Sequence, residues 1–278
     1  MPPLPIAVIV PHAGLNIPPE MINSLALNEI DIFNEADIYT DFIFDYRDRV
    51  SHWLRFPYAR VLIDVNRADQ ADLIPRPGDG IIKTQSSYGV QLFKKGREPD
   101  QNLKHQLIDR YWRPWNQKMA AIAADPSIKL VIYPHSMAAQ RPSTFGDQIM
   151  QARPRCCICN MGDANGEIEA TRERVSIAPP LARSFAANWG DRLTEVPALG
   201  PTDGKASINQ PFWGGWQLWA HSNKAQPWIM IELSRALYLG EQNGDSPIRP
   251  PNWSAIQLIR ERTWETILEL YNQVSAGS

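Results

Sequence analysis

The chain has only three cysteines, and all of them fall in one short stretch, as Cys156, Cys157 and Cys159. An odd, clustered set of thiols excludes a disulfide framework and fits a reducing compartment. A closed zinc–thiolate site needs a fourth Cys or His, and the next acidic residues, Asp163 and Glu167, are poor substitutes. We therefore assign no chemistry to the cysteines.

Long apolar runs and a charge excess of either sign are also lacking. No stretch approaches the roughly 18 apolar residues that cross a bilayer, and the start MPPLPIAVIVPHAG lacks the basic segment of a secretory signal. Lys and Arg number 28 against 30 Asp and Glu, so no basic field is available for nucleic acid. We expect a cytoplasmic protein without membrane or nucleic-acid partners, while the oligomeric state stays open.

Several catalytic signatures are missing as well. The sequence contains no G-x-S-x-G elbow, no G-x-x-x-x-G-K-[ST] loop, no strand-linked G-x-G-x-x-G and no H-E-x-x-H helix. The sequence therefore gives no local evidence for a serine hydrolase, a P-loop enzyme, a dinucleotide-binding protein or a zinc protease of the H-E-x-x-H type.

What is present predicts one large α/β domain over residues 1–278. Hydrophobic residues make up 44% of the chain, enough for a substantial core. Short apolar runs predict strands at 5–11, 60–67, 128–134 and 227–234. Helical spacing predicts helices at 20–30, 35–54, 101–124 with a kink at Pro114, 181–189 and 254–274. Gly and Pro predict long loops at 69–100 and 196–217, the first of a length that is often functional, as in a lid.

Polar residues lie near the ends of four predicted strands. They are His12, the group Asp64, Asn66 and Arg67, then His135 and Glu232. In open α/β sheets ligands bind beyond the carboxyl ends of the strands. The pattern therefore predicts that these side chains share one site.

His12 and His135 each follow an apolar strand and a proline, which makes them candidate metal ligands. A hydrolytic zinc site takes about three protein ligands from His, Asp and Glu and leaves one position for water. A hydrogen-bonded structural role is the alternative for each histidine alone. Together with the nearby carboxylates, the pair makes the metal interpretation as strong as the structural one.

Glu232 lies inside the apolar run WIMIELS, where an unpaired carboxylate costs several kcal/mol. A functional explanation is a general base with a raised pKa that takes a proton from water at a metal. The alternative is a salt bridge to Arg235.

Arg67 is a candidate for binding a substrate carboxylate, because a guanidinium offers two parallel hydrogen bonds. An ordinary ion pair with Asp64 or Asp69 is the stronger interpretation of the local sequence. Arg113 and Arg141 are further candidates for the same role.

Seven short motifs then occur in a particular order. They are VPHAG at 10–14, the pair Asp41 and Asp45, LIDVNR at 62–67, YWRPW at 111–115, PHSM at 134–137, PFWGGW at 211–216 and IELSRALY at 231–238. In this order and spacing they resemble the N-formylglutamate amidohydrolase family over most of the chain.

The resemblance implies a fold and a set of roles. The family is similar to zinc carboxypeptidases and to the succinylglutamate desuccinylase and aspartoacylase group. Their fold is a mixed, mostly parallel sheet of about eight strands sandwiched between helices. By this likeness His12 and His135 match the zinc histidines. Asn66 and Arg67 match the pair that binds the substrate carboxylate, and Glu232 matches the base.

Two positions depart from the relatives' pattern. Leu15 stands where relatives have a ligating glutamate, so the third ligand must come from elsewhere; Asp41 is our first choice and Asp45 the second. Tyr133 stands two residues before His135, where relatives have an acidic residue, so a carboxylate that orients the imidazole is expected to be missing.

We therefore expect an amidohydrolase with one zinc ion per chain that removes a small, formyl-like acyl group from an N-acyl amino acid such as N-formylglutamate. A metal-free binding protein for a carboxylated ligand is one alternative, favoured by Leu15 and Tyr133. A carboxypeptidase-like activity on short peptides is another. The sequence does not distinguish which acyl group or amino acid is used.

Overall fold

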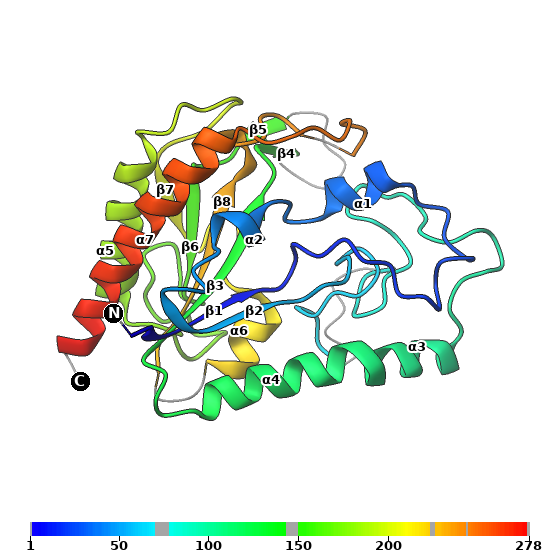
Figure 1. The fold of residues 1–278 in the computed structure, drawn as a ribbon, viewed down its shortest axis with the longest axis horizontal. Helices are drawn as coiled ribbons and strands as arrows, with labels where there is room; N and C mark the ends of the chain where they lie inside the picture. The colour runs from blue at the N-terminus through cyan, green and yellow to red at the C-terminus, as the bar shows by residue number, and fades with distance from the viewer. Residues whose placement is uncertain (1, 70–77, 143–149, 223–225, 243, 277–278) are drawn as a thin grey trace.

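A six-stranded sheet forms the centre of the molecule (Figure 1). The computed structural model describes residues 2–69, 78–142, 150–222, 226–242 and 244–276. The sheet strands, in spatial order, are β2 (Val50–Arg55), β1 (Leu4–Val10), β3 (Leu130–Met137), β8 (Trp228–Ser234), β6 (Cys156–Cys159) and β7 (Ala206–Ile208). A separate two-stranded ribbon pairs β4 (Gln140–Pro142) with β5 (Met150–Ala152).

Four neighbouring strands of the sheet run in the same direction. β2, β1, β3 and β8 are parallel, β6 is antiparallel to β8, and β7 is parallel to β6. The carboxyl ends of β1, β3 and β8 therefore meet at one edge. The expected mixed α/β sheet is confirmed, but the expected number of about eight strands is wrong, because this sheet has six.

Helices cover both faces of the sheet (Figure 1). α5 (Pro179–Leu193) and α7 (Trp253–Ala276) lie on one face, and α4 (Arg113–Ala124) and α6 (Gly215–His221) lie on the other. The other helical elements of the described residues are α1 (Glu29–Glu35), α2 (Thr40–Ile43), α3 (Gln101–Leu107), the π-helical turn η2 (Ile108–Trp112) and the 3-10 turn η3 (Arg235–Leu237). Alternate residues of β1 divide between two cores: Ile6 packs with α5 and α7, and Ala7 packs with α4 and α6. Within the described residues, no helix combines the length and apolar character needed to span a bilayer.

The strongest sequence patterns predicted their elements correctly. The apolar runs at 5–11, 128–134 and 227–234 form β1, β3 and β8, and the closing helix is α7. The helix expected at 181–189 is the middle of α5. Helical structure also fills 101–124, and Pro114, where a kink was expected, lies in the first turn of α4, directly after the π-helical turn. Proline cannot donate a backbone hydrogen bond, so regular pairing is interrupted there.

Between residues 20 and 67 the predicted elements are mostly wrong. The helix expected at 35–54 is only the one-turn α2 followed by β2, and residues 60–67 form turns with one isolated bridge, Ile63 to Ile82. Residues 20–24 form turns and Leu25 forms an isolated bridge to Phe93, so the helix expected at 20–30 is replaced by the later α1. Apolar residues in this region recur at helical spacing and are buried, but the segments that contain them are irregular. The backbone groups of these segments form hydrogen bonds with distant parts of the chain.

The long loop at 69–100 is partly a core element. Residues 70–77 lie outside the described part, while Ile81, Ile82, Leu92 and Phe93 are buried in the core beneath α4. A strand was not expected at the cysteines, yet they form β6, which lies between β8 and the edge strand β7, and they are fully buried.

Candidate metal centre and active site

Three buried side chains converge at the carboxyl edge of the sheet. His12 follows β1, Asp37 precedes α2, and His135 lies in β3. His12 Nδ1 and His135 Nδ1 are 3.2 Å apart. Asp37 Oδ2 lies 3.0 Å from His135 Nδ1 and 3.4 Å from His12 Nδ1. The backbone N–H of Asp37 also donates to the His12 carbonyl at 3.0 Å, which fixes the loop against β1.

The three ligand atoms fit a tetrahedral ion. A zinc–nitrogen bond of about 2.0–2.1 Å places neighbouring ligand atoms of a tetrahedron about 3.3 Å apart. The observed separations of 3.0, 3.2 and 3.4 Å match these edges. Two imidazole nitrogens and one carboxylate are also the donor set of catalytic zinc sites, which leave a fourth position open.

Asp37 and His135 hold protonation states that suit ligands. Burial raises the pKa of Asp37, but the neighbouring His12 and His135 and the charge of Arg60 together hold it below its ordinary value. Burial lowers the pKa of His135 to about 4. Near neutral pH, Asp37 is therefore an anion and His135 a neutral imidazole with a free lone pair.

Asp64 lies behind His12, and its carboxylate makes four contacts, each a hydrogen bond or an ion pair. Its Oδ1 accepts from His12 Nε2 at 2.9 Å and from the backbone N–H of Asn66 at 3.0 Å. Its Oδ2 lies 3.0 Å from Arg60 Nη2 and 2.9 Å from Lys83 Nζ. A carboxylate behind a ligating histidine orients the ring, so Asp64 supplies for His12 the kind of partner expected to be missing beside His135.

The cations beside Asp64 keep it ionised. Burial opposes ionisation, but the charges of Lys83 and Arg60 outweigh it and hold the pKa of Asp64 well below its usual value. Burial lowers the pKa of Lys83, and the neighbouring Asp64 counters that effect.

Glu232 lies beside His135 on the next strand. The two residues are register partners between β3 and β8, and Cys157 of β6 is the partner of Glu232 on its other side. Glu232 is buried, and its Oε2 has no hydrogen-bond partner among the described residues. Burial first, and then the charge of Asp37, raise its pKa well above the usual value. A carboxyl group of this kind can exchange a proton near neutral pH.

Arg235, the alternative partner of Glu232, points elsewhere. Its Nη1 donates to the carbonyls of Asn34 and Ala36 and to Gln242 Oε1 at 2.7–3.2 Å. These bonds join the segment after β8 to the end of α1.

The structure brings Asp37, and not Asp41, to the two histidines. Asp41 pairs with Arg55 at 2.8 Å, and the second choice, Asp45, pairs with Arg47. Asp37, Asp41 and Asp45 are four residues apart within the helix expected at 35–54, a spacing that would place them on one helix face, but the chain is extended at Ala36 and the helix at 40–43 is one turn long. The aspartates therefore point to different surroundings.

The side chains of Asn66 and Arg67 bind different partners. Asn66 Oδ1 accepts the backbone N–H of Gln217 at 2.8 Å, which fastens the start of α6. Arg67 Nε lies 3.2 Å from Asp79 Oδ1, so its ion pair is with Asp79 instead of the expected Asp64 or Asp69. The side chain of Arg67 is 28% exposed.

The other two candidate arginines are not brought to the site by any described contact. Arg113 is exposed and pairs with Asp109 at 3.0 Å and with Asp69 at 3.7 Å. The backbone of Arg141 belongs to β4, and its side chain lies outside the described part.

Sequence reasoning missed Asp37 as a ligand, and it missed Arg60 and Lys83 altogether. Asp37 stands four residues before Asp41 in the sequence, so the same spacing could have pointed to it. Lys83 follows the apolar pair Ile81 and Ile82, and a lysine beside buried residues is a weak signal, because most lysines in such positions reach solvent.

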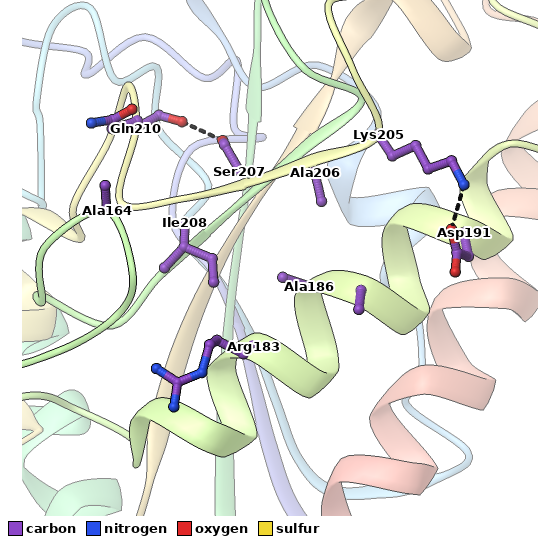
Figure 2. A pocket seen from close by; sticks show the side chains of 10 residues that line it. Ala164, Arg183, Ala186, Asp191, Lys205, Ala206, Ser207, Ile208 and Gln210 are labelled. Carbon is purple, nitrogen blue, oxygen red and sulfur yellow. Dashed lines mark hydrogen bonds and ion pairs between the residues drawn. The ribbon is translucent and has the colours of Figure 1, made fainter.

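A surface hollow of about 490 Å3 lies between α5 and β7, separated from β3 by two strands (Figure 2). Alanines line much of it, and its charged residues pair locally, as Lys205 does with Asp191 at 2.7 Å. Its lining includes none of the residues that converge at the histidines.

Comparisons with known proteins place the chain in a family. The sequence model of the N-formylglutamate amidohydrolase family matches residues 4–239. No curated protein matches the chain.

Two solved structures share the fold. An N-formylglutamate amidohydrolase from Ralstonia eutropha JMP134 superposes with a TM-score of 0.71 at 19% identity, covering 99% of this chain and 96% of that one. A gene product from Agrobacterium tumefaciens superposes with a TM-score of 0.59 at 14% identity, covering 98% and 89%.

Proposed function

Because the chain belongs to the N-formylglutamate amidohydrolase family, we propose that it hydrolyses the amide bond of N-formylglutamate or a close N-acyl amino acid with one zinc ion. Family membership makes it a hydrolase of amide bonds. The zinc dependence, the ligands and the roles of individual residues are our proposal.

His12, Asp37 and His135 would hold the ion. When bound, zinc supplies Lewis-acid chemistry: it polarises the acyl carbonyl and makes water more acidic. Asp64 would orient His12 through its hydrogen bond to Nε2.

Glu232 is the proposed general base and acid. Its neighbour across the strands is His135, so its carboxyl group lies beside the proposed ligands. Glu232 takes a proton from the attacking water, the water oxygen bonds to the acyl carbon, and the C–N bond then breaks. Glu232 returns the proton to the departing amine, so that water and the formyl amide become formate and the free amino acid.

Arg67 is the proposed anchor of a substrate carboxylate. Asp79 holds its guanidinium in place, and more than a quarter of the side chain is exposed. Asn66 fastens α6 beside it. A bidentate guanidinium bond of this kind fixes the distance between the acyl group and the base.

The observation that carries the proposal is the convergence of His12, Asp37 and His135 at 3.0–3.4 Å beside a buried carboxyl group. It weakens the case for a metal-free binding protein, which depended on Leu15 and Tyr133. The Leu15 side chain is 39% exposed, and Asp37 offers a carboxylate beside the two histidines instead.

Elemental analysis and an assay of formate release test the proposal. We expect about one zinc per chain and release of formate from N-formylglutamate, both lost in His135→Ala. The matched control is His105→Ala, since His105 is exposed on α3 and contacts none of the proposed ligands. A wild-type protein that takes up no zinc after its addition would refute the metal, and zinc binding without amide hydrolysis would refute the reaction.

A further inference from the structure

Lys83 is one of the largest fully buried side chains in the described structure. Its Nζ lies 2.9 Å from Asp64 Oδ2 and 3.9 Å from Asp79 Oδ1. Burying an ammonium group costs several kcal/mol unless it is paired and hydrogen-bonded. A lysine kept in this position needs an explanation beyond solubility or surface charge.

The backbone places Lys83 against Asp64. Ile82 forms the isolated antiparallel bridge to Ile63, and the backbone N–H of Asp64 donates to the carbonyl of Ile81 at 2.8 Å. The segment that carries the lysine is therefore paired to the segment that carries the aspartate. Their contact follows from main-chain pairing as well as from charge.

The two oxygens of Asp64 have different partners. Oδ1 accepts from His12 Nε2 and from the backbone of Asn66, and Oδ2 accepts from Lys83 and Arg60. An ionised carboxylate can only accept hydrogen bonds. His12 must therefore carry a proton on Nε2, and in the neutral ring the lone pair of Nδ1 then faces Asp37 and His135.

We propose that Lys83 and Arg60 are positioning residues, whose hydrogen bonds to Asp64 Oδ2 hold Oδ1 against His12 and so set the tautomer and ring orientation of that ligand. The consequence for zinc affinity rests on the proposed function, whereas the state of His12 in the metal-free protein does not.

Charge and positioning predict opposite effects on metal binding. By Coulomb's law alone, removing a cation near the site strengthens the binding of a divalent metal ion. Loss of the positioning hydrogen bond weakens binding, because Asp64 loses a donor and no longer fixes His12 as firmly. Lys83→Met and Lys83→Gln separate the two effects, since both are neutral and similar in size but only glutamine can donate to Asp64 Oδ2.

Zinc affinity, measured by competition with a chromogenic chelator, is the first readout. Changes in partners behind a metal ligand cost about 10- to 100-fold in affinity. We expect Lys83→Met to bind zinc about 10- to 100-fold more weakly than Lys83→Gln, with Lys95→Met, an exposed control, at the wild-type value. Equal affinities for the methionine and glutamine variants, or tighter binding by methionine, would overturn the proposal.

The second readout needs no metal. The nitrogen chemical shifts of His12 in the zinc-free protein report its tautomer. We expect the Nε2–H form in the wild type and in Lys83→Gln, and a mixture of both forms in Lys83→Met. If the wild type binds no zinc, the proposed function fails while this measurement still decides the role of Lys83.

Arg60 provides a second pair of variants should Lys83→Met fail to fold. Its side chain is 22% exposed, so Arg60→Met and Arg60→Gln disturb the core less. We expect Arg60→Met to bind zinc more weakly than Arg60→Gln and to show the mixture of His12 tautomers. Equal zinc affinities and equal His12 tautomers in the two variants would refute the positioning role.

Discussion

Replacing Asp37 with asparagine removes one proposed ligand charge while keeping the shape of the side chain. Asp37 Oδ2 lies within 3.4 Å of both histidine nitrogens, so the change acts directly on the ligand set. Zinc bound by four ligands in peptides is worth about 10–16 kcal/mol, or about 2.5–4 kcal/mol per ligand. Since about 1.4 kcal/mol is tenfold in affinity, we expect zinc binding to weaken by roughly two to three decades.

Asp41→Asn is the matched control. Asp41 is the nearest aspartate along the chain, and its partner is Arg55 at the partly exposed rim of β2. Loss of that ion pair should lower the free energy of unfolding by at most about 1 kcal/mol and leave zinc affinity unchanged. Chelator competition measures the affinity, and urea unfolding of the metal-free proteins measures stability. Wild-type zinc affinity in Asp37→Asn, together with a loss in Asp41→Asn, would refute the ligand assignment.

Three further outcomes are expected. Glu232→Gln should keep its zinc and lose about 10²- to 10⁴-fold in kcat, because the proton-transfer group is gone; steady-state kinetics with metal analysis checks this, and unchanged turnover would exclude Glu232 as the base. Arg67→Ala should raise KM with metal content unchanged, whereas Arg113→Ala, on the exposed face of α4, should leave KM alone; equal effects would contradict the assignment. Burial lowers the pKa of His221 to about 4, below its unfolded value of about 6.5, so the unfolded chain binds more protons between these values. Stability from this group is complete above about pH 6.5 and is lost as pH falls toward 4; urea unfolding of His221→Asn should show a shallower decline in that window, and an unchanged slope would rule out the contribution.

The proposed base and two of the three proposed ligands could be identified from sequence for a simple physical reason. β1, β3 and β8 are central parallel strands buried on both faces, and such strands are continuous apolar runs that end abruptly in polar residues. His12, His135 and Glu232 stand out against those runs. Parallel strands bring their carboxyl ends together, so a shared site follows from the pattern alone.

Asp37 and Lys83 could not be identified in this way, because their surroundings are built by segments without regular structure. The helical spacing of Asp37, Asp41 and Asp45 was misleading, since the chain between them is mostly not helical. Lys83 lies in a Gly-rich and Pro-rich stretch whose pairing with Asp64 is made by a single bridge and one backbone bond.

The sequence by itself determined the α/β class, the central strands, the closing helix and the edge of the sheet where the proposed site lies. These follow from local periodicity, which reports how each segment is buried. Only the tertiary structure decided the number of strands in the sheet, the carboxylate that joins the histidines and the buried cations behind them. Those depend on contacts between residues far apart in the chain, and charge pairing in a buried site is set by distances that no local pattern encodes.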